Sequence, residues 1–228
     1  MKNRISYLLI ALLTISIWGC EKEYDTVTRI TYFPDIVVAG QPVVFSVQNA
    51  TYTDQGAKST ENGKEITTKV VSTVNSSAIG SYSVNYSAIN VDGFAASASR
   101  KVIIYDPKTN TADISGQYSG DVMRNGTRGY KGNPVTLTKV AGMNGIYAIS
   151  DWIAGFYDVG THYKYGPDYR FVGYIQITSD NKVLWLDVSN PWEDPFTSVV
   201  GNFDPVTQKI NYTAMWAGYS FVVTLTKI

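Results

Sequence analysis

The hydrophobic and polar positions of this chain follow the two-residue period of β-strands. Residues 81–88 are the clearest case, because Tyr82, Val84, Tyr86 and Ala88 alternate with serine and asparagine and would share one face. No segment after residue 20 repeats apolar residues at the i, i+3, i+4, i+7 spacing of an amphipathic helix. The pattern therefore predicts an all-β protein, which agrees with the frequent tyrosine, 17 in all.

Short apolar runs in residues 29–106 predict a small N-terminal β-sandwich. The runs at 36–38 and 43–47 flank a Gly-Gln-Pro turn. A strand over 81–88 leads through an Asn-Val-Asp-Gly turn to a long strand over 95–105. A hairpin of this length, closing a segment of about 80 residues, favours two packed sheets.

Residues 112–228 form a second predicted unit, after a linker at 107–111 that is rich in proline, asparagine and threonine. About eight antiparallel strands favour a β-barrel-like or rolled sheet over a sandwich, since closure removes exposed edges. We expect the first and last of these strands to pair. The expected strands lie at 116–124, 134–140, 145–150, 170–178, 182–188, 197–203, 208–216 and 219–227.

Three stretches of the N-terminal unit resemble bacterial immunoglobulin-like (Ig-like) domains. Residues 80–88 read Gly-Ser-Tyr-Ser-Val-Asn-Tyr-Ser-Ala, an Asp-Gly turn follows, and 99–106 read Ser-Arg-Lys-Val-Ile-Ile-Tyr-Asp. Together they are similar to the last hairpin of these domains, and Tyr52, Asp54 and Gly56 are similar to an earlier Tyr-x-Asp-x-Gly loop. The Cys…Trp…Cys core of antibody domains is missing. The resemblance implies an Ig-like β-sandwich that serves as a spacer or an adhesive unit.

The first 20 residues are typical of a bacterial lipoprotein signal. Lys2 and Arg4 precede a short apolar run that ends at the only cysteine, Cys20. The run is too short for a transmembrane helix, which needs about 20 apolar residues. The residues before Cys20 resemble the bacterial lipobox, with Trp18 where that motif usually has a small residue. We expect a signal peptide over 1–19 and lipid attachment at Cys20, which would anchor the protein to a membrane. The alternative is a plain signal peptide followed by an ordinary cysteine.

Residues 20–28 are expected to form an acidic tether. The acidic residues just after Cys20 resemble the surface-export signal of Bacteroidota lipoproteins, which implies display on the outer face of the outer membrane. A simple solvated linker has the same composition. The sequence Asp25-Thr26-Val27 also resembles an O-glycosylation sequon of Bacteroidota, which makes Thr26 a candidate site of modification.

Composition argues against several classes of function. There is one histidine, His162, and one cysteine, so neither a multi-histidine metal site nor a thiol nucleophile is expected. The sequence has no nucleophile elbow, phosphate-binding loop or dinucleotide fingerprint. Basic and acidic residues balance at 19 each, which argues against nucleic acid as a partner. We expect no catalytic residue, no metal and no cofactor, although a carboxylate pair for glycoside hydrolysis could come from any part of the chain.

Two segments of the C-terminal unit concentrate aromatic and polar side chains. Residues 151–170 alternate aromatic rings with glycine, aspartate and arginine, and residues 190–196 place a tryptophan between two prolines and beside two acids. A flat ring covers the apolar face of a sugar, while charged groups bind its hydroxyls. The same residue types form protein-interface hot spots, and small β domains also bury aromatics as core. The candidate ligand-binding residues are Trp152, Tyr157, Asp158, Tyr163, Tyr165, Asp168, Tyr169, Arg170, Trp192 and Glu193.

Alternation sorts two further tryptophans. Trp216 shares a face with Ile210, Tyr212 and Ala214, which predicts that it belongs to the core. Trp185 shares a face with Val183 and Asp187, and the carboxylate predicts that this face is the wetter one.

The whole arrangement resembles two-domain Bacteroidota lipoproteins, in which an Ig-like module precedes a C-terminal β domain with a stretch like Tyr-Ala-Ile-Ser-Asp-Trp at 147–152. Several of these proteins are encoded near glycan-utilisation genes. One hypothesis is a non-catalytic surface lipoprotein that binds polysaccharide through the aromatic loops, with the Ig-like module as spacer. The alternative is a structural or adaptor lipoprotein that docks to another envelope protein. Exposure of the aromatic rings favours binding, and burial favours a scaffold.

Overall fold

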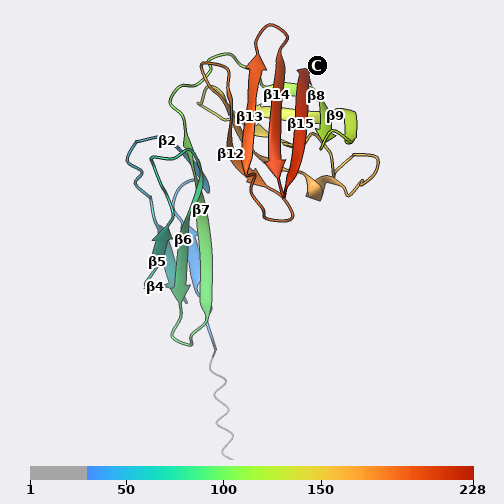
Figure 1. Cartoon of the computed structure of the whole chain (residues 1–228). Coiled ribbons are helices and arrows are strands. Elements are labelled where there is room, and N and C mark those ends of the chain that lie inside the picture. The colour runs from blue at the N-terminus through green and yellow to red at the C-terminus, as the bar shows by residue number, and fades with distance from the viewer. Residues whose placement is uncertain (1–29) are drawn as a thin grey trace, which may run out of the picture. The chain divides into compact units, whose positions relative to one another are not determined.

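The computed structural model describes residues 30–228, and within them every regular element except one 3₁₀ turn, η1 (Pro167–Tyr169), is a β-strand (Figure 1). The predicted all-β class is therefore confirmed. Residues Phe33–Ile228 form one compact unit. The predicted signal peptide, the acidic tether, the lipid site at Cys20 and the modification site at Thr26 lie outside the described residues. Across 30–228 no helix is long and apolar enough to cross a membrane.

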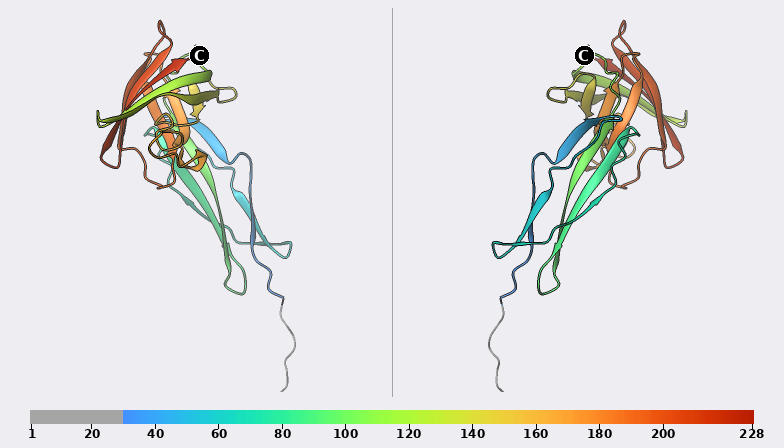
Figure 2. Two further views of the ribbon diagram at one scale, coloured as in Figure 1. Left: turned by 90° about the vertical axis from the view of Figure 1, so that its right-hand side faces the viewer. Right: turned by 90° about the vertical axis from the view of Figure 1, so that its left-hand side faces the viewer.

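Two sheets make up an N-terminal sandwich (Figures 1 and 2). One sheet has the order β1-β3-β4, and the other has the order β2-β7-β6-β5, in which only β2 and β7 are parallel. Ile36 and Val38 of the first sheet pack against Val84 and Val102 of the second. The strands are β1 (Asp35–Val38), β2 (Val43–Val47), β3 (Ala57–Glu61), β4 (Lys64–Ile66), β5 (Lys69–Ser72), β6 (Gly80–Ile89) and β7 (Ala95–Tyr105).

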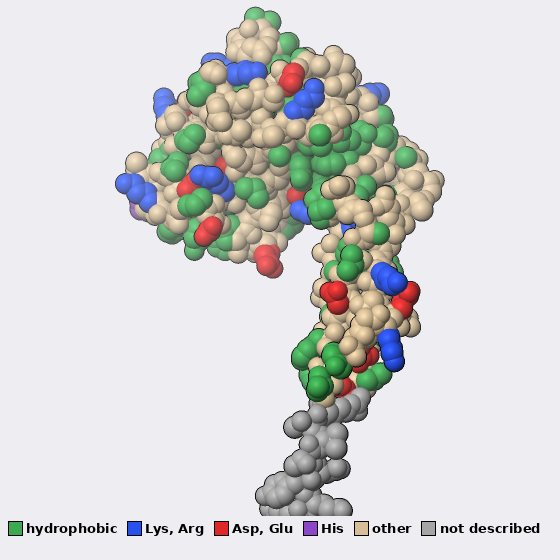
Figure 3. Space-filling model, turned by 180° about the vertical axis from the view of Figure 1, so that it is seen from behind, with side chains coloured by type: hydrophobic (Ala, Val, Ile, Leu, Met, Phe, Trp, Pro, Cys, Tyr) green, Lys and Arg blue, Asp and Glu red, His purple; other side chains and the backbone are tan. Residues whose placement is uncertain are grey.

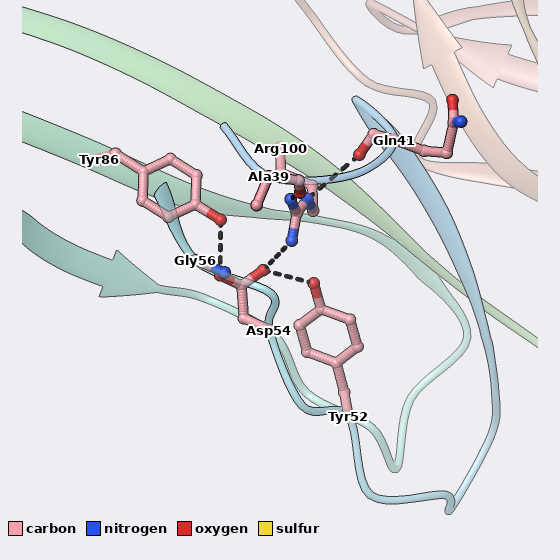
Figure 4. A network of polar contacts seen from close by, with 7 residues as sticks. All are labelled: Ala39, Gln41, Tyr52, Asp54, Gly56, Tyr86 and Arg100. Atoms are coloured by element: carbon pink, nitrogen blue, oxygen red, sulfur yellow. Dashed lines mark hydrogen bonds and ion pairs between the residues drawn. The ribbon is translucent and has the colours of Figure 1, made fainter. Parts of the chain in front are cut away.

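A buried ion pair joins β7 to two loops of this sandwich (Figure 4). Arg100 is completely buried, and its Nη1 donates to the Asp54 carboxylate at 2.5 Å. Its Nε donates to the carbonyl oxygen of Gln41 at 3.2 Å, and its Nη2 donates to that of Ala39. A buried guanidinium needs such a set of acceptors, because an unpaired charge in the interior is very costly.

The Asp54 carboxylate collects three further donors. The hydroxyls of Tyr52 and Tyr86 donate to it at 2.8 and 2.6 Å, and the Gly56 N–H donates at 2.7 Å. Burial works to raise the pKa of Asp54, but these hydrogen bonds together with the charge of Arg100 lower it. The Tyr-x-Asp-x-Gly loop identified in the sequence is therefore the partner of the buried arginine.

The β6–β7 turn end of the sandwich carries exposed apolar side chains, which appear green at the lower end of the molecule in Figure 3. Ile89, Val91 and Phe94 are all exposed there, and the Phe94 ring meets the Phe33 ring edge-on at 5.0 Å. This end is distinct from the aromatic segments of the C-terminal unit.

The C-terminal unit is one eight-stranded antiparallel sheet with the order β12-β11-β10-β9-β8-β15-β14-β13. The edge strands β12 and β13 approach each other through a single bridge between Lys182 and Asn202, so the sheet is a nearly closed barrel. The predicted barrel-like architecture and the pairing of its first and last strands are confirmed. The strands are β8 (Gly116–Arg124), β9 (Arg128–Lys139), β10 (Ile146–Ile149), β11 (Val172–Ile177), β12 (Val183–Ser189), β13 (Ser198–Asp204), β14 (Lys209–Trp216) and β15 (Tyr219–Lys227).

The barrel core takes the residues that alternation assigned to it along β14. Ile210, Tyr212, Ala214 and Trp216 are all buried, so the prediction for Trp216 is confirmed. The predicted bounds were short for β9, which begins at Arg128 rather than at 134.

Alternation fails along β12 because of a β-bulge. The partner strand opposes Trp185 and Asp187 with consecutive residues, so Leu186 is an extra residue. Asp187 is buried, and its carboxylate binds Lys101 of the sandwich at 2.6 Å. Trp185 packs, partly buried, against the barrel core. The expectation of a wetter face for Trp185 and Asp187 is therefore wrong.

Strands β7 and β12 bring the sandwich and the barrel into contact. Ile103 of β7 forms a small buried cluster with Ile146 and Leu186 of the barrel. The Gln176 side chain accepts from the Asp106 N–H at 3.0 Å and donates to its carbonyl at 2.7 Å. The segment 107–111 also contacts the barrel, since the Asn110 N–H donates to the backbone carbonyl of Ile177 in β11 at 2.9 Å. The predicted linker is thus held against the barrel by hydrogen bonds.

Candidate functional site

The two aromatic segments predicted from the sequence lie against each other. They form the β10–β11 and β12–β13 connections, and alternate connections of an up-and-down sheet lie at the same end. The Trp192 ring lies 5.1 Å from that of Tyr157, 5.6 Å from that of Tyr169 and 5.9 Å from that of Phe171. Side chains about 20 to 35 residues apart in the chain therefore make one cluster.

The start of the 151–170 segment is folded around a buried carboxylate. Asp151 accepts from the backbone N–H groups of Ile153 at 3.0 Å, Gly155 at 2.9 Å and Phe171 at 3.3 Å. Burial raises the pKa of Asp151 to about 6, against the lowering effect of these hydrogen bonds. Gly155 has a positive φ of 70°, and a side chain there would collide with Val159. The segment is consequently a tightly folded turn rather than a loose loop.

Two of the candidate rings belong to the core of this turn. The Trp152 side chain is completely buried. Its indole Nε1–H donates to the backbone carbonyl of Asp187 at 3.1 Å, and the Tyr212 hydroxyl donates to the backbone carbonyl of Trp152 at 2.6 Å. Tyr157 is only 6% exposed. Neither ring has a free face for a ligand. The prediction that Trp152 and Tyr157 belong to a ligand-binding surface is therefore wrong.

The 190–196 loop is held at both ends. The Asn190 side chain accepts from the Trp192 N–H at 3.0 Å and donates to the Asp194 carbonyl at 2.6 Å. Trp216 Nε1 donates to the same carbonyl at 3.2 Å, and the Phe196 ring is buried. These contacts fix the loop before any ligand arrives, which lowers the entropy cost of binding.

Four candidate rings remain accessible and form a continuous surface, which we call the aromatic face: Tyr163, Tyr165, Tyr169 and Trp192. Neighbouring rings in this order lie 5.3, 4.9 and 5.6 Å apart. Tyr165 is 50% exposed and Trp192 is 39% exposed, while Tyr163 and Tyr169 are half-buried. Trp192 rests on the buried Trp216 at 5.2 Å. The face therefore stands on the barrel core.

The candidate polar residues divide into two groups. Asp158 is buried, and its carboxylate accepts from Arg170 Nε at 2.5 Å. It is a structural partner of Arg170, so its prediction as a ligand contact is wrong. Asp168, in η1, and Glu193, beside Trp192, are exposed. Arg170 keeps part of its guanidinium accessible, with 40% of its side chain exposed.

Two arginines that the sequence did not single out complete this end of the barrel. Arg124 donates to the hydroxyls of Tyr157 at 3.2 Å and Tyr163 at 2.9 Å, and Arg128 also donates to Tyr163 at 2.9 Å. Arg124 also lies over the ring of Tyr219, 4.8 Å from its centroid. These residues flank the β8–β9 and β14–β15 turns. The rule that every second connection lies at one end could have placed them beside the aromatic segments.

The described residues contain no group of three His, Cys, Asp or Glu side chains that could hold a metal ion. His162 is exposed, and its ring meets Tyr163 at 4.7 Å. The arrangement offers flat rings and charged side chains on a fixed frame, which suits binding of a ligand with both apolar and hydroxyl-bearing faces.

Comparisons with known proteins divide the chain in two. A family model described as a C-terminal domain matches residues 106–227, and a model for the Ig-like domain of bacterial surface proteins matches residues 36–104. The Ig-like resemblance is therefore confirmed. The crystal structure of the lipoprotein BT2262 from Bacteroides thetaiotaomicron is similar, with a TM-score of 0.46 and 25% identity, over 86% of this chain and 100% of that chain. No curated protein matches the chain.

Proposed function

Because the chain belongs to the family defined by this C-terminal domain, with an Ig-like domain of bacterial surface proteins before it, we propose that it is a non-catalytic surface lipoprotein that binds glycan. The aromatic face is the proposed binding surface. Cys20 is the proposed lipid site, and it would hold the protein at the outer membrane, on its cell-surface side. Thr26 is a proposed site of O-glycosylation in the tether.

The observation that carries this proposal is the accessible row of rings. Exposed tryptophan and tyrosine rings side by side are costly to leave in water, and a sugar polymer presents apolar faces at a regular repeat. Tyr165 and Trp192 are the most exposed members of the row. Because the supporting loops are already fixed by hydrogen bonds, little ordering would accompany binding.

Exposed charged groups at the edge of the row supply the polar half of the site. Asp168 and Glu193 would accept hydrogen bonds from sugar hydroxyls, and Arg170 would donate them. These groups carry charges of both signs, which suits a neutral sugar better than a strongly charged one.

Binding of soluble polysaccharides to the chain from residue 21 onward tests the proposal. The probes are starch, xylan, mannan and mucin glycans, measured by affinity electrophoresis and titration calorimetry. Trp192→Ala and Tyr165→Ala should each weaken binding by about 5- to 150-fold, since one stacked ring contributes about 1–3 kcal/mol. Phe94→Ala removes an exposed ring at the β6–β7 turn of the sandwich, which is distinct from the aromatic face, and should leave binding unchanged.

Two outcomes would count against the proposal. If the parent protein binds none of the probes, glycan binding is not supported. If instead Trp192→Ala and Tyr165→Ala abolish capture of a purified envelope protein, the aromatic face is a docking surface, as in the adaptor hypothesis.

A further inference from the structure

A cavity of about 490 Å³ lies where the start of β6 faces the bulged strand β12. One wall belongs to the N-terminal sandwich and includes Gly80, Ser81 and Tyr82. The other wall belongs to the barrel and includes Trp185, Asp187 and Glu193. Its volume falls in the range of about 300–1,000 Å³ that is typical of small-molecule sites. A cavity with walls from both units is a candidate site that the aromatic face alone does not include.

The walls combine an aromatic ring with hydrogen-bonding groups. Trp185 supplies aromatic surface, Ser81 supplies an exposed hydroxyl, and Glu193 supplies an exposed carboxylate. The Asp187 carboxylate is held in place by Lys101 at 2.6 Å, which balances its charge. The Glu193 carboxylate disfavours an anionic ligand, and it can accept hydrogen bonds from the hydroxyls of a neutral one. The chemistry is therefore that of a sugar site.

The 190–196 loop borders both the cavity and the aromatic face. Trp192 belongs to the aromatic face, and the next residue, Glu193, lines the cavity. At the end of this loop, the Phe196 ring lies 5.8 Å from that of Trp185 and 6.0 Å from that of Phe171. The Phe171 ring in turn contacts Trp192. One rigid loop therefore presents neighbouring side chains to both places.

The β6 wall is held by its neighbouring strand. Ser81 is exposed, while its backbone is fixed by pairing with Ile103 of β7. The wall is firm, since β7 itself is anchored to the barrel through Ile103 and Lys101.

We propose that a glycan bound on the aromatic face extends past Glu193 into this cavity, so that the N-terminal sandwich forms part of the binding site. This inference rests on the proposed glycan binding. It assigns the Ig-like module a direct role in recognition, in addition to that of a spacer. Longer chains should therefore bind more tightly than short ones, because only they reach both places.

Filling the cavity tests the inference. Ser81→Trp places a large ring in it, at a strand position that tolerates aromatic residues. Asn85→Trp is the matched control, since Asn85 is exposed on the same face of β6 and does not line the cavity. The probes are the polysaccharide bound by the parent and the disaccharide prepared from it. Hydrogen exchange of the amides at 79–82 is measured with and without the polysaccharide.

The expected result is that Ser81→Trp weakens polysaccharide binding at least about tenfold, leaves disaccharide binding unchanged, and removes ligand-induced protection at 79–82. Asn85→Trp should match the parent throughout. If Trp192→Ala loses binding while Ser81→Trp binds normally and no protection appears at 79–82, the inference is overturned and glycan binding by the aromatic face stands. If the parent binds no glycan, both proposals fall together.

Discussion

Asp54→Asn is the sharpest test of how the N-terminal sandwich is held together. The substitution keeps the size of the side chain but removes the charge that faces the completely buried Arg100. The remaining acceptors of that guanidinium are two backbone carbonyls, at Gln41 and Ala39. The variant therefore leaves a positive charge in the interior without a counter-ion.

The expected loss can be estimated from this geometry. Removing one partner of a buried ion pair costs about 3–5 kcal/mol. The Asp54 side chain is 20% exposed, so water can replace part of its contribution and the lower end of this range applies. The total free energy of unfolding of a domain is about 5–15 kcal/mol. A loss of about 3 kcal/mol at a urea slope of about 1.5 kcal/mol/M shifts the midpoint by about 2 M.

Urea unfolding of the sandwich, followed by hydrogen exchange of the β6 and β7 amides, measures this shift. Every tryptophan after residue 20 lies in the barrel, so tryptophan fluorescence reports the barrel separately. Glu65→Gln is the control, because its ion pair with Lys58 is exposed and such pairs contribute about 0–1 kcal/mol. A midpoint shift for Asp54→Asn no larger than that of Glu65→Gln would refute the argument that Arg100 depends on its carboxylate partner.

Three further predictions concern the barrel and the anchor. Trp216→Ala should destabilise the barrel by about 3–5 kcal/mol in thermal unfolding, while Trp192→Ala should leave its melting temperature nearly unchanged. Burial raises the pKa of Asp151 to about 6, so its protonated form is favoured in the folded state. The free energy of unfolding of the barrel should therefore fall as the pH rises from 4 through 6. Asp151→Asn should reduce this pH dependence, measured by unfolding at a series of pH values. Cys20→Ala should abolish acyl labelling and move the protein from the membrane fraction to the soluble fraction.

Much of the fold could be predicted because strand periodicity depends only on the nearest neighbours in the chain. The expected strands of the barrel correspond to β8–β15, with bounds that agree best where apolar residues alternate strictly. The short strands β3, β4 and β5 were not expected, because they are rich in lysine, glutamate and serine and bury little surface. The Asn62-Gly63 turn between β3 and β4, with both φ angles positive, was the available signal.

The candidate site was harder to predict, because burial of an aromatic ring depends on the tertiary structure. Trp152 and Trp192 look alike in sequence, each in a loop with acids and glycine or proline nearby. Trp152 is buried because Asp151 turns the chain inward and Asp187 accepts its indole N–H. Likewise, the bulge in β12 turns Asp187 toward Lys101, which alternation cannot anticipate.

The place of β15 in the sheet has a consequence for how the protein matures. Strand β8 pairs with β15, so Arg124 lies opposite Phe221 at the middle of the sheet rather than at its edge. The centre of the barrel therefore cannot form until the ribosome has released residues 219–227. Non-local pairing of this kind also slows folding, to about milliseconds or seconds in all-β domains.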